Sequence, residues 1–247
     1  MKAATSGSTN PYTTIGDDGQ NTGYDIEVLK AVFEELPQYE LEFVTTDFGS
    51  IFEGTLSGSY DIAVNNFSYN AKRAESYLFS YPYDEISYVF VTKKGGKEIK
   101  SFKEAAGKTY RGGAGVSITT AIEKWNEDHP EEAINLEYTE QDTAVDLQQV
   151  ADGAVDFAII DLAMFVAYQN EYNFDIQMTP LSEEDTRAIA ENNYAYYLFA
   201  YDHDGLRQEV NTVLKKFQED GTLTKISKEW FGQDTAPDAS QFEKTLN

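Results

Sequence analysis

The segment YDIAVNNFSYNAKRAESYLFSYP, residues 60–82, decides the fold of this chain. It opens with an apolar run at residues 61–64, which predicts a buried strand, and a polar turn is predicted at residues 65–70. Arg73 comes directly after this turn. Guanidinium binds a carboxylate through two parallel hydrogen bonds, and open α/β sheets bind ligands at the carboxyl ends of their strands. Arg73 is therefore a candidate ligand-binding residue, and the alternative is a surface arginine paired with an acidic side chain.

The composition narrows the class of protein. With 41% hydrophobic and 14% aromatic residues among 247, the chain is long and apolar enough to form a large core. Its 43 acidic and 19 basic residues give a net charge of −24, which excludes nucleic acid as a partner and predicts a soluble monomer. No apolar run approaches the roughly 20 residues of a membrane-spanning helix. Cysteine is absent, which excludes disulfides, thiol catalysis and thiolate metal sites.

Alternating strand and helix patterns predict an α/β fold with mostly parallel sheets. The first half is predicted to contain strands at residues 3–5, 41–45 and 61–64, with helices at 25–36 and 50–57. A basic, glycine-rich break at residues 93–97 ends a strand at 88–92 and is the best candidate for a domain boundary. Beyond it the patterns predict strands at 108–110, 136–138, 155–160 and 194–201, and helices at 101–106, 119–126, 143–151, 162–168, 207–218 and 223–231.

Two polar positions in the second half are candidate ligand contacts. A glycine-rich loop at residues 111–117 opens a helix, where backbone N–H groups and the helix dipole favour an anion. This loop contains Gly115, Val116 and Ser117, and it lacks the G-K-[ST] ending of a P-loop. Asp161 comes directly after the strand at 155–160, where it can bind a ligand or cap the next helix.

The N-terminal segment SGSTNPY, residues 6–12, is a further candidate contact. Its glycine and small hydroxyl residues allow a ligand to approach the backbone closely, and Ser6, Thr9 and Tyr12 are the residues that we select from it. An ordinary turn before a hairpin is the alternative.

The motifs resemble one known family, the solute-binding proteins that feed polar amino acids to ABC importers. That family reads D-x-x-x-x-G-x-T-x-T-x-x-R and then F-S-x-P-Y. The corresponding residues here are Asp61, Asn66, Ser68, Asn70 and Arg73, and then FSYPY. The segments GYDIEVL at 23–29 and DGTLTKISKEWFG at 220–232 resemble two further signatures, so the resemblance covers nearly the whole chain. Asn66 replaces the usual glycine, and Ser68 and Asn70 replace threonines.

The resemblance implies a two-lobed periplasmic-binding-protein-like fold of type II, with two mostly parallel sheets flanked by helices. Lobe 1 would comprise residues 1–91 plus 193–247, lobe 2 residues 92–192, and 233–247 a polar tail. Two crossing strands would form a hinge that closes around the ligand.

The resemblance assigns ligand-binding roles to the residues of this chain that occupy the corresponding motif positions. Arg73, with Ser68 and Asn66, would bind the α-carboxylate of an amino acid, and Asp161 its α-ammonium. The loop Gly115, Val116 and Ser117 would add backbone donors to the carboxylate. Phe48 would place its ring against the ligand side chain, although core packing is the alternative for a lone phenylalanine.

The expected function is therefore capture of a free amino acid and its delivery to the membrane subunits of an ABC importer, without catalytic residues, metal or cofactor. Asn65, Asn66 and the run at 77–80 resemble the cystine-binding branch, so cystine is the first choice among polar amino acids. The alternatives are an enzyme on the same fold, similar to cyclohexadienyl dehydratases, or the ectodomain of a ligand-sensing receptor. The resemblance implies an extracytoplasmic protein, periplasmic or a cell-surface lipoprotein, whose signal or lipoprotein leader would have been removed, since residues 1–4 do not resemble a signal peptide.

Overall fold

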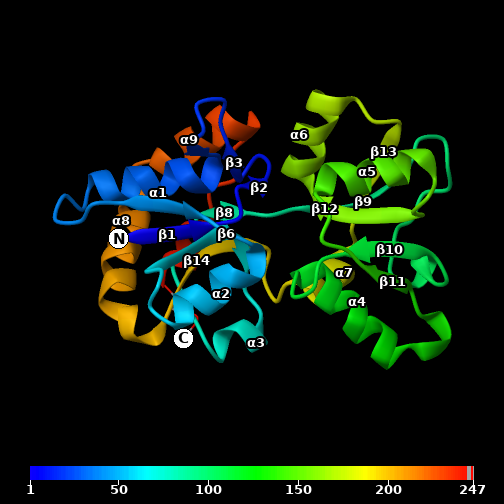
Figure 1. Cartoon of the computed structure of the whole chain (residues 1–247), viewed down its shortest axis with the longest axis horizontal. Helices are drawn as coiled ribbons and strands as arrows, with labels where there is room; N and C mark the ends of the chain where they lie inside the picture. Colours follow the sequence, from blue (N-terminus) through cyan, green and yellow to red (C-terminus); the bar gives the residue numbers. More distant parts are fainter. Residues whose placement is uncertain (244–245, 247) are drawn as a thin grey trace. The chain divides into compact units, whose positions relative to one another are not determined.

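The structure is a computed structural model that describes residues 1–243 and 246 (Figure 1). Its contacts divide the chain into two compact units. Unit 1 consists of Met1–Ile86 together with the segment from Tyr194 onward, and unit 2 is Ser87–Asn193. The chain therefore passes between the units twice. The strand Tyr88–Lys93, which sequence analysis assigned mainly to lobe 1, belongs to unit 2 because it pairs with two strands there.

The main sheet of unit 1 is mixed, with a parallel block that begins at the edge strand β5. Strands β5, β1 and β6 run parallel, and β14 pairs antiparallel with β6. Two short strands, β7 and β8, pair with β14. The bounds are β1 Lys2–Thr5, β5 Glu42–Thr45, β6 Ile62–Ser68, β7 Leu78–Phe79, β8 Asp84–Glu85 and β14 Tyr194–Phe199.

Helices cover both faces of this sheet (Figure 1). α1 buries Ile26, Leu29 and Phe33 and ends before Pro37, which cannot continue a helix. α2 contacts β1 and β6. The bounds are α1 Tyr24–Glu34, α2 Phe48–Leu56, α3 Ala71–Ala74, α8 Asp204–Glu219 and α9 Thr222–Phe231. A separate small antiparallel sheet contains β2 Ser8–Thr9, β3 Thr13–Ile15 and β4 Asn21–Thr22.

Unit 2 contains a five-stranded sheet in the order β11-β10-β12-β9-β13. β10 pairs parallel with β11 and β12, whereas β9 pairs antiparallel with β12 and β13. The bounds are β9 Tyr88–Lys93, β10 Thr109–Gly112, β11 Asn135–Tyr138, β12 Phe157–Asp161 and β13 Ile176–Pro180. The predicted α/β class with mixed, mostly parallel sheets is confirmed.

Alternate residues of β9 and β12 enter two different cores. Phe90, Phe157 and Ile159 pack into one cluster with residues of α4 and α7, and Val91 and Ile160 pack into another with residues of α5 and α6. Both strands are therefore buried on both faces, which explains their continuous apolar sequence. Figure 1 shows α5 and α6 above this sheet and α4 and α7 below it. The bounds are α4 Ser117–Asp128, α5 Thr143–Asp152, α6 Leu162–Tyr172 and α7 Glu183–Ile189.

Several expectations about local structure were wrong. The polar turn predicted at residues 65–70 begins later, because β6 continues to Ser68. The helix predicted at 101–106 is a 3₁₀ turn, Lys103–Ala105. β13 and α7 were not predicted: β13 is an edge strand that ends at Pro180, and the acidic residues of α7 hide its amphipathic pattern.

The described part of the polar segment expected to be a tail, residues 233–243, packs against the rest of unit 1, and residues 244, 245 and 247 of that segment lie outside the described residues. Phe242 lies in the 3₁₀ turn Ala239–Glu243, is 1% exposed, and its ring centre is 5.5 Å from that of Tyr81. The Thr235 carbonyl accepts a hydrogen bond from the Glu85 N–H (2.8 Å). A single buried aromatic residue gives no periodic pattern, so the sequence does not reveal this packing.

No helix within residues 1–243 combines the length and the apolar character needed to cross a lipid bilayer.

Candidate functional site

Arg73 in unit 1 is held in place by main-chain and aromatic contacts. It lies in α3, where its N–H donates to the Asn70 side chain at the helix start (2.8 Å). Its Nη1 donates to the Ser68 carbonyl at the end of β6 (2.9 Å). Only 9% of the residue is exposed. The short helix therefore places a buried guanidinium directly beside the carboxyl end of a central strand.

Two aromatic rings lie against this guanidinium, and a third ring packs against those two. The central carbon of the guanidinium lies 5.4 Å from the ring centres of both Phe52 and Phe67. Phe48 belongs to the same cluster, with its ring centre 5.2 Å from that of Phe52 and 5.9 Å from that of Phe67. Rings that face a cation stabilise it by roughly 0.5–2 kcal/mol. The structure thus places Arg73 and Phe48 against the same two rings, and Arg73 also contacts Ser68 at the end of β6.

Asn66 explains one departure from the family pattern. Its φ of 46° lies in the left-handed region, which glycine adopts freely and asparagine more readily than other residues. Its N–H donates to Asp25 Oδ2 in α1 (2.6 Å). Asparagine at the position of the usual glycine therefore keeps the backbone conformation that this position requires.

The N-terminal candidates are organised by a residue that sequence analysis did not select as a site residue. Asn65 Oδ1 accepts from Ser6 Oγ (2.7 Å) and from the Ser6 N–H (3.0 Å), and its Nδ2 donates to Thr9 Oγ1 (3.2 Å). Tyr12 lies deeper: it is 1% exposed and its ring centre is 5.5 Å from that of Phe231. A polar residue directly after the apolar run at 62–64 was the available signal for Asn65.

In unit 2, Asp161 ends β12 and caps α6. Its Oδ1 accepts from the N–H groups of Ala163 (2.7 Å) and Met164 (3.4 Å), and its Oδ2 accepts from the Ser87 N–H (3.2 Å). The residue is 4% exposed. The capping role that the sequence left open is therefore observed. The Asp161 carboxylate thus accepts hydrogen bonds from main-chain N–H groups both at the start of α6 and at Ser87.

The glycine-rich loop leads into α4 as predicted, although the helix begins two residues earlier than expected. Gly115 has a φ of +76°, Val116 is the N-cap residue, and Ser117 is the first residue of α4 and 9% exposed. Val116 packs partly against the hydrophobic cluster beneath the loop. A glycine here lets the chain turn so that the positive end of the helix dipole comes directly after it.

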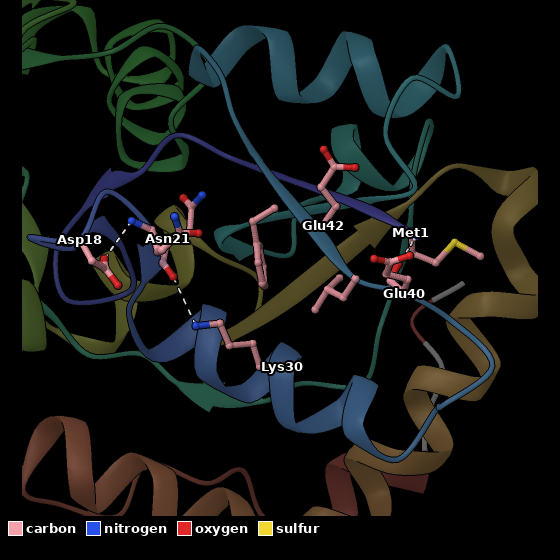
Figure 2. A pocket seen from close by; sticks show the side chains of 9 residues that line it. Met1, Asp18, Asn21, Lys30, Glu40 and Glu42 are labelled. Carbon is pink, nitrogen blue, oxygen red and sulfur yellow. Dashed lines mark hydrogen bonds between the residues drawn. The ribbon is translucent and has the colours of Figure 1, made fainter.

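A surface cavity of about 680 Å³ in unit 1 contains none of these residues (Figure 2). Among its described lining residues, Lys30 alone has a positively charged side chain, and Lys30 Nζ already contacts Glu27 Oε1 (2.9 Å) and the Asn21 carbonyl (3.4 Å). The lining residues are Met1, Asp18, Gln20, Asn21, Lys30, Glu40, Leu41, Glu42 and Phe43. We therefore assign no ligand to this cavity.

Comparison with known proteins places the whole chain in one group. Residues 1–233 match the sequence profile described as "Bacterial extracellular solute-binding proteins, family 3". The L-cystine-binding protein TcyJ of Bacillus subtilis is 30% identical over 231 residues, which cover 93% of this chain and 82% of TcyJ. The L-cystine-binding protein TcyA of the same organism is 30% identical over 238 residues, covering 96% of this chain and 82% of TcyA.

A solved structure resembles this chain over almost its full length. It comes from work on glutathione import in Gram-positive bacteria via GshT and the cystine ABC importer TcyBC of Streptococcus mutans. The TM-score is 0.90 and the identity 34%, and the match covers 97% of this chain and 98% of the other. An ancestral arginine-binding protein bound to arginine has a TM-score of 0.79 at 23% identity, covering 94% of this chain and 97% of the other, which shows a shared fold alone.

Proposed function

The chain belongs to family 3 of the bacterial extracellular solute-binding proteins, and we propose that it binds a free amino acid, with cystine as the first choice, for delivery to the membrane subunits of an ABC importer. The observation that carries this proposal is the geometry of Arg73. Its guanidinium is buried at a strand end, is oriented by the Ser68 carbonyl at 2.9 Å, and lies over two aromatic rings. A buried, oriented guanidinium is suited to bidentate recognition of a carboxylate.

Two charged residues are assigned to the two charges of an amino-acid head group. Arg73 in unit 1 binds the α-carboxylate, with Ser68 and Asn66 at the same strand end. Asp161 in unit 2 accepts hydrogen bonds from the α-ammonium while it continues to cap α6. The backbone of Gly115, Val116 and Ser117 at the start of α4 adds donors to the carboxylate.

The remaining candidates contact the ligand side chain. Phe48 offers the face of its ring, and Ser6 and Thr9 offer hydroxyl groups. Tyr12 shapes the same part of unit 1 from the interior, since it is almost completely buried. The names of TcyJ and TcyA support cystine over other amino acids, because each relative is 30% identical over more than nine tenths of this chain.

Glutathione is the second candidate ligand. It is favoured by the likeness, at 34% identity and a TM-score of 0.90, to a structure from work on glutathione import. The γ-glutamyl end of glutathione carries the same α-carboxylate and α-ammonium pair as cystine. Both candidates therefore satisfy Arg73 and Asp161, and they differ in the side chain attached to this head group.

The proposal assigns binding and no reaction to this chain. Arginine cannot act as a proton donor or acceptor near neutral pH, and Asp161 already accepts three N–H bonds. His129 stacks on Trp125 with ring centres 3.9 Å apart, and His203 contacts Asp61 and Asp202. In the part of the chain that the structure describes, neither histidine contacts a residue that we assign to the ligand. The family description also supports an extracytoplasmic location.

Thermal unfolding against a panel of ligands tests this function. The panel contains the twenty amino acids, cystine, glutathione and glutathione disulfide. A ligand at 100 times its dissociation constant adds about 2.7 kcal/mol to the free energy of unfolding, which raises the unfolding midpoint by several degrees. We expect the largest rise with cystine. A chain whose midpoint none of these compounds raises would contradict the proposal.

A further inference from the structure

Strand β6 contains a bulge at the position of Asn65 and Asn66. Ala63 and Phe67 of β6 pair with Leu198 and Tyr196 of β14. Three residues of β6 thus lie opposite the single residue Tyr197, so β6 has two extra residues between these pairs. Bulges bend a strand and redirect its side chains, and they are frequent beside functional sites.

Backbone contacts hold this bulge in place. Asn66 has a φ of 46° and its N–H donates to the buried carboxylate of Asp25 in α1 at 2.6 Å. The main chain of β6 is thereby anchored on one side to α1. The left-handed conformation of Asn66 also interrupts the regular extended backbone of the strand.

Both the oxygen and the nitrogen of the Asn65 amide form hydrogen bonds with the N-terminal segment. Oδ1 lies 2.7 Å from Ser6 Oγ, 3.0 Å from the Ser6 N and 3.3 Å from Thr13 Oγ1. Nδ2 donates to Thr9 Oγ1 at 3.2 Å. These contacts fix which end of the amide is the acceptor, because the Ser6 N–H can only donate. Asn65 is 7% exposed, so water does not replace these bonds when they are lost.

The bonds of Asn65 span the Ser6–Thr9 turn, in which residues 6 and 7 connect β1 to β2 and residues 8 and 9 form β2. Gly7 in this turn has a φ of 65°. Ser6 and Ser8 Oγ also form a hydrogen bond (3.2 Å) at the exposed side of this turn. The planar amide group of Asn65 forms hydrogen bonds with Ser6 and with Thr9, which lie at the two ends of the turn. Its amide therefore sets the separation and orientation of these two hydroxyl-bearing residues.

We propose that Asn65 is a positioning residue for ligand recognition: through the β6 bulge it holds the Ser6–Thr9 turn in the arrangement that contacts the ligand side chain. This inference rests on the proposed function, in which Ser6 and Thr9 contact the ligand. Asn65 acts through these residues and does not itself need to touch the ligand. The chemistry that the turn recognises is a polar, hydrogen-bonding side chain, since hydroxyl groups supply both donors and acceptors.

Two variants of Asn65 and one matched control test this role. Asn65→Leu removes every bond to the turn, whereas Asn65→Asp keeps the acceptor for Ser6 and removes the donor to Thr9. Thr13→Val removes a different bond to the same Oδ1 and leaves the bonds to Ser6 and Thr9 intact. The dissociation constant for cystine is measured by isothermal titration calorimetry, at a temperature where circular dichroism shows each ligand-free variant to be folded.

We expect Asn65→Leu to raise the dissociation constant about tenfold or more, because two or more buried hydrogen bonds of about 1 kcal/mol each orient the turn. Asn65→Asp should raise it by a smaller factor, and Thr13→Val should leave it within about twofold of the wild-type value. Combining Asn65→Leu with Thr9→Ala should weaken binding no more than Asn65→Leu alone, since both changes disturb the same turn. A purely structural role would lower the unfolding midpoint and leave both the affinity of the folded protein and this non-additivity unaffected.

The outcomes are separable. If the wild type binds cystine and folded Asn65 variants bind it equally well, the positioning role is refuted and the proposed function stands. If Thr13→Val weakens binding as much as Asn65→Leu, the role of Asn65 is general stabilisation and the inference fails. If Asn65→Leu does not fold, Asn65→Asp decides by the same criterion. A wild-type chain that binds no compound of the ligand panel would overturn the proposed function and this inference with it.

Discussion

Arg73 Nη1 donates a hydrogen bond to the main-chain carbonyl of Ser68 at 2.9 Å, so the guanidinium is oriented by the end of the strand that precedes it. This bond uses one of the five N–H donors of arginine, whose planar fork matches the geometry of a carboxylate. The short helix α3 places Arg73 in this position, because Asn70 caps the helix and Arg73 lies three residues later.

Arg73→Lys should abolish most ligand binding while the protein remains folded. Lysine keeps the charge but cannot form two parallel bonds to a carboxylate. Loss of one of the two charge-assisted hydrogen bonds costs about 1.5–3 kcal/mol of binding free energy. Isothermal titration calorimetry with cystine measures the change, and circular dichroism checks the fold. Affinity within a factor of two of the wild type would refute the assigned role of Arg73.

Two variants at Asp161 separate its capping role from its role toward the ligand. Asparagine caps a helix about as well as aspartate, so Asp161→Asn should keep the cap on α6 and weaken binding strongly because the negative charge is lost. Asp161→Ala removes the cap as well and should cost about 1 kcal/mol of unfolding free energy in addition. Urea unfolding and calorimetry on the same samples distinguish the two effects. Equal ligand affinity of Asp161→Asn and the wild type would leave Asp161 with the capping role alone.

Gly23 is required for steric reasons at the start of α1. Its φ is +124°, and a Cβ atom there would lie 2.1 Å from the carbonyl oxygen of Tyr12. The adjacent Asp25 N–H donates to this same carbonyl (3.1 Å), so the oxygen cannot easily move. We expect Gly23→Ala to lower the free energy of unfolding by about 3 kcal/mol or more.

Gly19→Ala is the matched control for Gly23→Ala. Gly19 also has a positive φ, +76°, but a Cβ atom there would meet nothing within 4 Å. The backbone strain alone should cost about 1 kcal/mol. Denaturant unfolding of both variants compares them directly, and similar losses would show that the contact with Tyr12 is not the cause.

Asp146 in unit 2 should make stability depend on pH. Burial raises the pKa of its carboxyl to about 6 from an ordinary 3.8; nearby Arg111 opposes the rise and Asp142 adds to it. Its Oδ1 is buried without a hydrogen-bond partner within the described part of the chain. Because the pKa is higher in the folded state, the group's contribution to stability is fully present below pH about 4 and is lost as the pH rises through about 6.

Asp146→Asn imitates the protonated carboxyl at every pH. The free energy of unfolding of the variant, relative to that of the wild type, should therefore increase between pH 4 and pH 7. Taking this difference removes the contributions of the many other acidic groups, which both proteins share. Urea unfolding at five or six pH values measures it, and a difference that stays constant with pH would show that Asp146 titrates normally.

Sequence alone predicted the α/β class, most of the strands and helices, and the placement of Arg73 at a strand end. These features arise from local patterns: apolar runs, helical periodicity, and the glycine and proline residues that end helices. The resemblance could select the glycine of GYDIEVL, but the structural reason for it is the close approach to Tyr12, eleven residues earlier in the chain, which appears only in the structure.

The features that were not predicted depend on tertiary contacts. Asn65 and Asn66 look like a polar turn, yet they remain in β6 because a bulge accommodates them. Phe242 is buried in a segment without periodicity because it packs against Tyr81 far away in the chain. The amide of Asn65 organises Ser6 and Thr9 across nearly sixty residues, and no local pattern contains that relationship.

The most direct test of the account is isothermal titration calorimetry of the wild-type chain with cystine and with cystine dimethyl ester. The ester keeps both ammonium groups and the disulfide but has no free carboxylate for Arg73. We predict saturable, one-to-one binding of cystine and no measurable binding of the ester. Binding of both compounds with similar affinity would contradict carboxylate recognition by Arg73, and binding of neither would contradict cystine as the ligand.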